Sequence, residues 1–444
     1  MFDQNATSPF FDSEWMFGVS NGFDIVIGNP PYVQLQANGG ALRKMYEHCG
    51  FSSFTSMGDI YCLFYEKGYQ MLKDGGHLCY ITSNKWMRGS YGEKPRKLFA
   101  TKTNPILLVD FAGVKVFESA TVETNILLFA KADNQHSTRC AIIDKSGAKN
   151  LSLFVQQNCS ISNFNTSDSW VILSQIEQSI RRKIEAVGKP LKDWDIQIYR
   201  GVLTGYNEAF IISTEKRDEI LSNCLDEDER KRTAEIIRPI LRGRDIQRYN
   251  YEWADKWLIS TFPARHYDID NFPAIKDFLL SFDTRRLEQT GKEYIISGAK
   301  VKARKKTNNK WFETQDSISY WEDFNKPKIV YREIGTDMDA CLLSEEFVVN
   351  NKLYILTGNH LEYLIAFFNS RVFNKILMKA ANITGGKGAD FMYNVPVPMP
   401  SQSILQAISA TDFACNMEAQ KHVDVLFFEL LGLSEQERSW ISSE

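Results

Sequence analysis

The apolar run from Phe23 to Gly28 is followed at once by Asn29-Pro30-Pro31-Tyr32, and this junction constrains the fold more than any other part of the chain. A short run rich in β-branched residues is typical of a buried parallel strand. The two prolines cannot continue the strand, so a loop begins here. Ligands of open α/β sheets bind at the carboxyl ends of the strands. We therefore expect the side chains of this loop to lie at a ligand-binding edge of the sheet.

The residues after the loop alternate between helix-like and strand-like patterns. Apolar residues at helical spacing run from Asp59 to a stop at Gly75-Gly76, and a short helix is expected around 94–99. Further strands are expected over 77–82, 106–111 and 124–130. This alternation predicts an α/β layered sheet over residues 1–145. A polar stretch from about 132 to 170 reads as a closing strand and a linker, and a helix follows from Trp170 to about Gly188.

The residue types of the loop suit one chemical task. An exocyclic amino group on a flat ring is a poor nucleophile because its lone pair is delocalised into the ring. The side-chain oxygen of Asn29 and the main-chain carbonyl of Pro30 can both accept the hydrogens of such a group and free its lone pair. Pro31 holds the loop rigid, and Tyr32 offers a face on which a base can stack. A base in a duplex must be extruded to reach such a pocket.

This stretch resembles the catalytic motif of the amino-methyltransferase superfamily, in the group that methylates adenine in DNA from S-adenosylmethionine. Asp59-Ile60-Tyr61, the strand that ends in Thr82-Ser83-Asn84, and the segment from Thr124 to Leu128 resemble the next elements of that family. The resemblance implies that Phe117 faces Tyr32 across a flipped adenine. An ordinary core position for Phe117 is the equal alternative.

The second half of the chain resembles a TaqI-like C-terminal specificity domain. The segments that carry this resemblance are 199–207, 240–246, 327–332, 351–354 and 367–370. The resemblance implies a restriction–modification enzyme that binds double-stranded DNA. It implies a partial Rossmann-like sheet over 1–145, the C-terminal half of the methyltransferase catalytic domain. A linker and helix over 146–190, an α+β target-recognition domain over 191–400 and a C-terminal helical segment over 401–444 should follow. Within that last segment we expect one amphipathic helix over 403–431.

The Gly-rich cofactor turn of the family belongs before position 20, and no Gly-x-Gly turn precedes Phe23. We therefore expect the chain to need an N-terminal methyltransferase half, supplied upstream or in trans. The strand from Phe23 to Gly28 should then have an unpaired, apolar edge that recruits a partner strand. We expect the chain alone to bind S-adenosylmethionine weakly or not at all.

Basic residues in the second half are candidates for DNA contacts. The run over 300–310 contains no acidic residue and reads as a loop suited to phosphates, although a solvated loop would look the same. Arginines beside glycines could bind guanine or phosphate, or could equally form internal salt bridges. The sequence Gly385-Gly386-Lys387-Gly388 fits a DNA-contacting loop and a plain surface turn equally well. The candidate residues are Arg200, Arg242, Arg244, Lys300, Lys302, Arg304, Lys305, Lys306 and Lys387.

Composition narrows the remaining choices. The net charge of -3 requires that any nucleic-acid site gather its basic residues in one place. The eight cysteines lack metal-ligand spacing, and this pattern indicates reduced thiols in the cytoplasm and no metal site. No run approaches the ~20 apolar residues of a membrane span.

Two other functions remain open. One is methylation of a glutamine side chain or a ribosomal RNA base, because the same loop serves any planar amide or amine. The other is a catalytically inactive DNA-recognition subunit, which the expected lack of a cofactor half favours.

Overall fold

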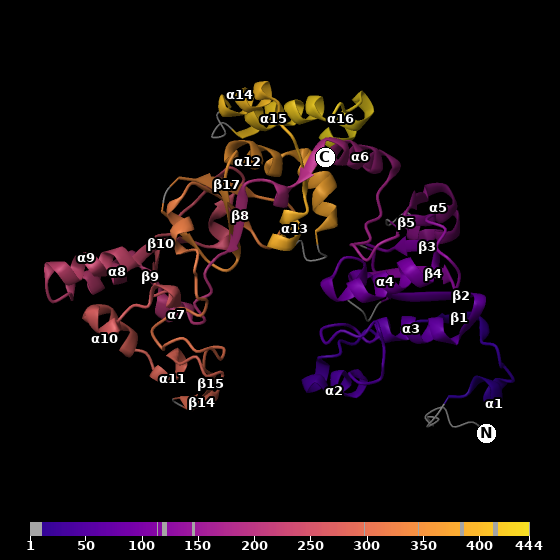
Figure 1. Ribbon diagram of the computed structural model, residues 1–444, viewed down its shortest axis with the longest axis horizontal. Coiled ribbons are helices and arrows are strands. Elements are labelled where there is room, and N and C mark those ends of the chain that lie inside the picture. Colours follow the sequence, from indigo (N-terminus) through magenta and orange to yellow (C-terminus); the bar gives the residue numbers. More distant parts are fainter. Residues whose placement is uncertain are drawn as a thin grey trace. The chain divides into compact units, whose positions relative to one another are not determined.

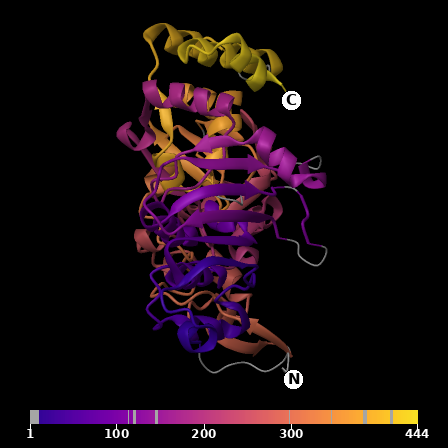
Figure 2. The ribbon, with the colours of Figure 1, turned by 90° about the vertical axis from the view of Figure 1, so that its right-hand side faces the viewer.

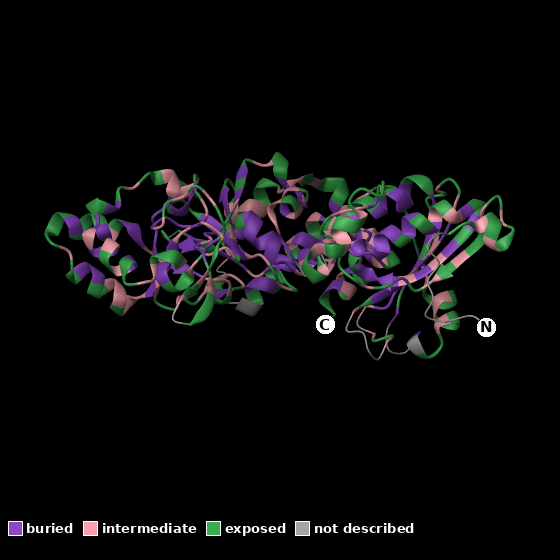
Figure 3. Cartoon of the chain, turned by 90° about the horizontal axis from the view of Figure 1, so that it is seen from below, coloured by how far each residue is buried: buried purple, intermediate pink, exposed green. Residues whose placement is uncertain are grey.

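The computed structural model describes residues 11–443, except 113, 118–121, 144–146, 297, 345, 382–385 and 412–415. The chain divides into two compact units, Met1–Ser179 and Ile180–Glu444. Each unit has a buried interior of its own, seen as purple segments in Figure 3. Among the described residues, no helix has the length and apolar character needed to cross a membrane.

The first unit is built on one mixed sheet of six strands, which are visible as a stack in Figure 2. Their spatial order is β1-β2-β4-β3-β5-β6, with β1 parallel to β2, β3 parallel to β5, and the other neighbours antiparallel. The strands are β1 (Phe23–Gly28), β2 (Leu72–Ser83), β3 (Asn104–Asp110), β4 (Thr124–Ala130), β5 (Thr138–Ile142) and β6 (Ser160–Ser162). The helices of this unit are α1 (Ser13–Phe17), α2 (Ala37–Tyr46), α3 (Tyr61–Met71), α4 (Glu93–Lys102) and α5 (Leu151–Asn158), and α6 (Gln175–Val187) runs across the boundary between the units.

The two faces of this sheet are covered unequally. On one face, α3 and α4 bury a large aromatic core in which Tyr65, Trp86 and Phe99 are fully enclosed. On the other face, α5 covers a smaller cluster around Phe111 and Ile143. The α/β fold expected from the sequence is confirmed. The polar stretch over 132–170 is not mainly a linker, because it contains β5, α5 and β6.

The register of the strands brings four chain segments to one edge of the sheet. Gly28 pairs with Tyr80 in the parallel pair β1–β2, so β1 and β2 end at the same edge. Because β4 is antiparallel to β2, its first residue, Thr124, pairs with Ser83 at that edge. Asp110, the last residue of β3, pairs there with Asn125. The loop after β1 therefore lies at a shared edge lined by the ends of β2 and β3 and the start of β4.

The second unit contains two four-stranded sheets, ordered β17-β16-β19-β8 and β18-β10-β13-β9 (Figure 1). The strands are β8 (Ile196–Arg200), β9 (Ile211–Ser213), β10 (Ile237–Leu241), β13 (Lys256–Ile259), β16 (Lys328–Arg332), β17 (Ala340–Leu343), β18 (Val348–Val349) and β19 (Leu353–Gly358). Three pairs of short strands complete it, namely β7 (Gly188–Pro190) with β20 (Pro396–Pro398), β11 (Ile246–Gln247) with β12 (Asn250–Tyr251), and β14 (Glu293–Ile296) with β15 (Ala299–Lys302).

The helices of the second unit pack around these sheets. They are α7 (Asn207–Phe210), α8 (Thr214–Ser222), α9 (Glu227–Ile236), α10 (Pro273–Leu280), α11 (Thr284–Leu287), α12 (Leu361–Asn369), α13 (Ala389–Tyr393), α14 (Gln402–Ser409), α15 (Asn416–Leu430) and α16 (Glu435–Ser442). Helix α12 lies against β16 and β17, with α14 and α15 on its other side. The single helix expected over 403–431 is wrong, because α14 already ends at Ser409.

Candidate active site and DNA-contacting residues

The Asn-Pro-Pro-Tyr loop leaves β1 at the shared strand edge and is held on both sides. At Gly28 a Cβ atom would lie 3.2 Å from the ring of Tyr80, so the absence of a side chain lets strand and ring approach closely. Asn29 is exposed, Pro30 is buried, Pro31 is exposed and Tyr32 is half-buried.

Beyond Tyr32, two main-chain hydrogen bonds tie the loop to the segment before α3. The Leu35 amide donates to the Gly58 carbonyl over 2.9 Å, and the Ile60 amide donates to the Val33 carbonyl over 2.9 Å. Leu35 and Ile60 are buried in one small apolar cluster with Leu63 of α3. The loop is thus anchored to the helix that covers the sheet, while the Asn29 amide remains accessible.

Tyr32 stands between two aromatic rings. Its ring centroid lies 6.3 Å from that of Tyr61, with the rings almost perpendicular at 88°. It lies 6.4 Å from Phe117, at 57°. A flat base between two rings needs about 7 Å, since each contact between carbon atoms takes about 3.5 Å. The structure therefore brings Phe117 to Tyr32 at close to that spacing, with the two ring planes tilted rather than parallel.

Hydrogen bonds of tyrosine hydroxyl groups hold the rings of Tyr32 and Tyr61 in place. The Tyr61 and Tyr91 hydroxyls are hydrogen-bonded at 2.7 Å, and the Tyr91 hydroxyl donates to Oδ2 of Asp59 over 3.0 Å. The Tyr32 hydroxyl donates to the Ile81 carbonyl over 3.4 Å. Burial raises the pKa of Tyr61 well above its usual value and raises the pKa of Tyr32 as well. The phenols thus stay protonated at neutral pH and hold the rings as neutral groups.

A second polar cluster at this edge was not expected from the sequence. Nδ2 of Asn84 donates to Oδ1 of Asp110 over 2.8 Å and to Oε2 of Glu123 over 3.4 Å. Burial raises the pKa of Asp110. Among the described residues, buried Oδ1 of Asn84, Oγ1 of Thr124 and Nδ2 of Asn125 have no hydrogen-bond partner. The sequence holds one signal for this cluster: the apolar strands β2, β3 and β4 each have a polar residue at the end that lies on this edge.

The residues beside β1 do not fit a site that would enclose a nucleoside cofactor. β1 is at the end of the sheet order, so its outer edge has no neighbouring strand among the described residues. The side chains of Ile25 and Ile27 are 68% and 77% exposed on the face away from the aromatic core. Asp24 forms an ion pair with Lys73, which lowers the pKa of its carboxyl group. The described residues beside β1 thus leave an open strand edge next to the loop.

Three of the candidate DNA-contacting residues are engaged inside the second unit. Arg304 is 4% exposed, and its guanidinium group donates to the carbonyls of Leu287, Thr204, Glu313 and Trp311. Lys387 is fully buried and donates to the carbonyl of Asp337 over 2.7 Å. Arg242 forms a two-pronged ion pair with Asp245. Burial and these partners leave Arg304 and Lys387 with no route to a phosphate. Gly385 of the expected glycine-rich loop lies outside the described residues.

The other basic candidates are accessible. Arg244, Lys302, Lys305 and Lys306 are exposed, and no ion pair is found for them among the described residues. Arg200 pairs with Glu333 at 2.9 Å and Lys300 with Glu293 at 2.6 Å, while both basic side chains stay substantially exposed. The basic run is not loop throughout, because Ala299–Lys302 forms β15. β15 pairs with β14 as a hairpin, and the exposed lysines of β15 form the first part of the basic run.

Comparison with known proteins finds a family match for two regions of the chain. Residues 2–117 match the Eco57I restriction-modification methylase family, and residues 238–388 match the TaqI-like C-terminal specificity domain. These two regions belong to those two domain families. The methylase region contains the Asn-Pro-Pro-Tyr loop and Phe117, and the specificity region contains Arg244 and the basic run.

Curated Type II methyltransferases align with nearly the whole chain. The chain is 24% identical to the Type II methyltransferase M.PaeR7I of Pseudomonas aeruginosa, over 94% of this chain and 72% of that protein. It is 23% identical to the Type II methyltransferase M.BstVI of Geobacillus stearothermophilus, over 94% of this chain and 74% of that protein. The fold is similar to that of the Type IIL restriction-modification enzyme MmeI, whose structure was solved in complex with DNA. The TM-score is 0.57 at 12% identity, covering 94% of this chain and 56% of that one.

Proposed function

We propose that the chain is the methyl-acceptor and target-recognition part of a DNA methyltransferase that transfers a methyl group from S-adenosylmethionine to the exocyclic amino group of adenine, within a restriction–modification system. The observation that carries the proposal is the Asn-Pro-Pro-Tyr loop at the shared strand edge, with the ring of Phe117 at 6.4 Å from that of Tyr32. The similarity to Type II methyltransferases supports DNA as the substrate class.

In this proposal, different residues of the loop and its surroundings bind different parts of the acceptor base. The exposed Asn29 amide oxygen and the Pro30 carbonyl accept the two amino hydrogens, which directs the nitrogen lone pair out of the ring plane. Tyr32 and Phe117 would hold the flipped adenine between them, and stacking of this kind contributes roughly 1–3 kcal/mol per base. Tyr61, fixed through Tyr91 and Asp59, keeps the Tyr32 ring in position. When bound, S-adenosylmethionine supplies the electrophilic methyl group.

DNA contacts come from the accessible basic residues of the specificity region. Lys302, Lys305 and Lys306 are exposed next to each other in or after β15, where phosphates of a duplex can reach them. Arg244 is exposed without an ion pair among the described residues and suits a guanine edge or a phosphate. Arg304 and Lys387 are left out of the proposed DNA-binding residues because both are buried.

A further polypeptide segment completes the sheet in this proposal. The outer edge of β1 is unpaired among the described residues, and Ile25 and Ile27 are largely exposed beside it. A hydrophobic free edge readily pairs with another strand. We infer that a methyltransferase half with a Gly-rich cofactor turn, upstream or in trans, supplies that strand and holds the methyl donor. The enzyme as a whole would work in the cytoplasm.

Radiolabelled S-adenosylmethionine titrated against the purified chain tests this division directly. We expect weak or no binding by the chain alone. Binding and methylation of duplex DNA should appear after fusion to a segment that carries the Gly-rich turn of a related methylase. Transfer to duplex DNA but not to ribosomal RNA or a glutamine peptide would favour the DNA enzyme over those alternatives. Tight binding by the chain alone would show that the cofactor site has been misplaced, and no activity after fusion would favour an inactive recognition subunit.

A further inference from the structure

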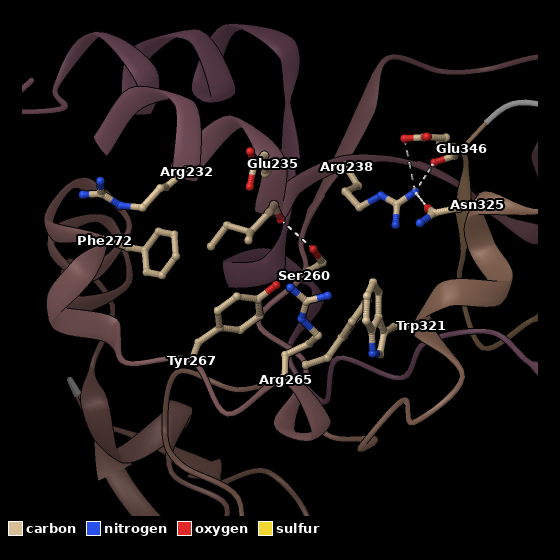
Figure 4. Close-up of a pocket in the computed structure, with 12 residues that line it drawn as sticks. Arg232, Glu235, Arg238, Ser260, Arg265, Tyr267, Phe272, Trp321, Asn325 and Glu346 are labelled. Carbon is tan, nitrogen blue, oxygen red and sulfur yellow. Dashed lines mark hydrogen bonds and ion pairs between the residues drawn. The ribbon is translucent and has the colours of Figure 1, made fainter. Parts of the chain in front are cut away.

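The second unit contains a cavity of about 380 Å³ bounded by α9, by the start of β10 and by the segment after β13 (Figure 4). It is separate from the β14–β15 hairpin, whose residues do not line it. The groups that line it are of two kinds, charged side chains and aromatic rings. Pockets for small ligands usually measure roughly 300–1,000 Å³, so this cavity has room for one nucleotide-sized molecule.

Arg265 brings a charge that is not neutralised. Its guanidinium group lies 3.8 Å from the centre of the Trp321 ring and 5.5 Å from that of Tyr267. No carboxylate pairs with it among the described residues, and its side chain is exposed to the cavity. Stacking fixes the plane of a guanidinium group and leaves its N–H edge free to bind two oxygens of an anion.

Arg238 brings a second, poorly compensated charge. Its side chain is only 13% exposed, yet the nearest carboxylate, that of Glu346, lies at 3.8 Å and is itself 73% exposed. Its Nη2 donates instead to two neutral oxygens, the amide oxygen of Asn325 over 2.6 Å and the main-chain carbonyl of Glu346 over 3.0 Å. Burial lowers the pKa of Arg238. A buried cation with a distant, hydrated counter-ion is stabilised when an anion binds beside it.

The other end of the cavity is aromatic. Tyr267 and Phe272 line it with their ring centroids 5.7 Å apart and their planes perpendicular. Glu235 of α9 lies across from Tyr267 in Figure 4, and its carboxylate makes no hydrogen bond or ion pair among the described residues. A flat ring can stack on Tyr267 or Phe272, and a carboxylate next to it accepts from an exocyclic amino group.

We propose that this cavity binds one nucleotide, with its phosphate on Arg265 and Arg238, its base against Tyr267 and Phe272, and a base amino group on Glu235. Three guanidinium groups against two carboxylates leave a net positive charge, which suits a phosphate. The nucleotide can be free in solution or an unpaired residue of a nucleic-acid strand, since both present the same groups. The site is independent of the methyl-transfer loop, because all of its lining residues belong to the second unit.

Calorimetric titration of the whole chain with AMP, CMP, UMP and inorganic phosphate, without S-adenosylmethionine, tests the site. AMP and CMP carry an amino group and UMP does not, so we expect them to bind at least about tenfold more tightly than UMP, or ~1.4 kcal/mol. Arg265→Ala should weaken AMP binding by a similar factor. Arg230→Ala, on the same helix α9 and 59% exposed outside the cavity, is the matched control and should change it less than about twofold.

Glu235→Gln provides a second variant in case Arg265→Ala impairs folding. Because Glu235 is exposed, this change should leave the fold intact. It should reduce the preference for AMP over UMP. The same variants are then titrated with a short single-stranded oligonucleotide and with its abasic counterpart. If free nucleotides fail but binding of the oligonucleotide depends both on the base and on Arg265, the nucleotide comes from a strand. Phosphate binding as tight as AMP binding overturns the proposal. It is also overturned if no base-dependent binding, free or in a strand, responds to either variant.

Discussion

The Asn-Pro-Pro-Tyr loop and the basic residues of the second unit differ in how far their neighbours in sequence determine their roles. In the loop, the strand and the two prolines place Asn29 at the strand edge, where it stays accessible, and contacts with the segment before α3 hold the loop there. In the basic run, adjacent residues have opposite fates, because Arg304 is buried against main-chain carbonyls while Lys305 is exposed. The position of a contiguous motif can therefore be predicted from the sequence, whereas the exposure of a single charged side chain depends on tertiary burial.

The largest expected effect is at the loop. In the enzyme completed with a cofactor-binding half, Asn29→Ala should slow methyl transfer by about 10³-fold, or ~4 kcal/mol of barrier, because the amide acts on the reacting group itself. DNA binding measured by filter retention should stay nearly unchanged, since the residues proposed to bind DNA belong to the other unit. Asn21→Ala, exposed in the loop before β1, is the control. A rate for Asn29→Ala within about tenfold of the parent would remove Asn29 from the proposed reaction.

The second test compares how Arg304 and the nearby Lys306 contribute to the free energy of unfolding. Arg304→Ala removes all the hydrogen bonds that its guanidinium group donates to buried carbonyls and should lower the free energy of unfolding by about 3 kcal/mol. Lys306→Ala, at an exposed position, should change it by less than about 0.5 kcal/mol. Urea unfolding followed by circular dichroism measures both. Equally small effects of the two substitutions would mean that the hydrogen bonds of Arg304 to main-chain carbonyls do not stabilise the fold.

A buried lysine makes a pH test possible. Burial lowers the pKa of the fully buried Lys387 to about 8. On unfolding, this pKa returns to the ordinary lysine value of ~10.4. Between these values the unfolded state binds more protons. The free energy of unfolding should therefore rise with pH, by up to ~1.4 kcal/mol per pH unit. Lys387→Met should lack this rise in urea titrations at pH 8, 9 and 10. Parallel pH profiles for the two proteins would place Lys387 in a hydrated setting and restore it as a candidate DNA contact.

The smallest effect is expected from the exposed lysines. Replacing Lys302, Lys305 and Lys306 together with alanine should weaken specific and non-specific DNA binding alike, by about tenfold or ~1.4 kcal/mol at moderate salt. The slope of log K against log salt should become shallower by up to ~0.9 for each phosphate that is no longer neutralised. Charge-preserving replacement by arginine at the same positions is the control. An unchanged slope would leave the run as a solvated surface.

The same contrast explains what could be predicted from the sequence. Strands β1 to β4 and helices α3 and α4 are predicted because their apolar periodicity is strong. The helix stop expected at Gly75-Gly76 is wrong, because α3 ends at Met71 and both glycines lie within β2. The closing strand expected in the polar stretch over 132–170 corresponds to β5, whereas α5 and β6 are not predicted because polar residues flank them. The buried Asn84–Asp110 hydrogen bond joins residues from two strand ends; the polar residue at each end hints at a cluster, but the pairing itself depends on the sheet order. The burial of Arg304 and Lys387 was missed because it too depends on tertiary packing.

The central claim is that the loop after β1 presents an adenine amino group for methylation. The most direct test is mass spectrometry of nucleosides from duplex DNA, methylated by the chain fused to the cofactor-binding segment of a related methylase. The account predicts N6-methyladenine, which should be lost together with activity in Asn29→Ala. A product consisting only of 5-methylcytosine would contradict it, because methylation at a ring carbon does not use an amino-hydrogen acceptor such as Asn29.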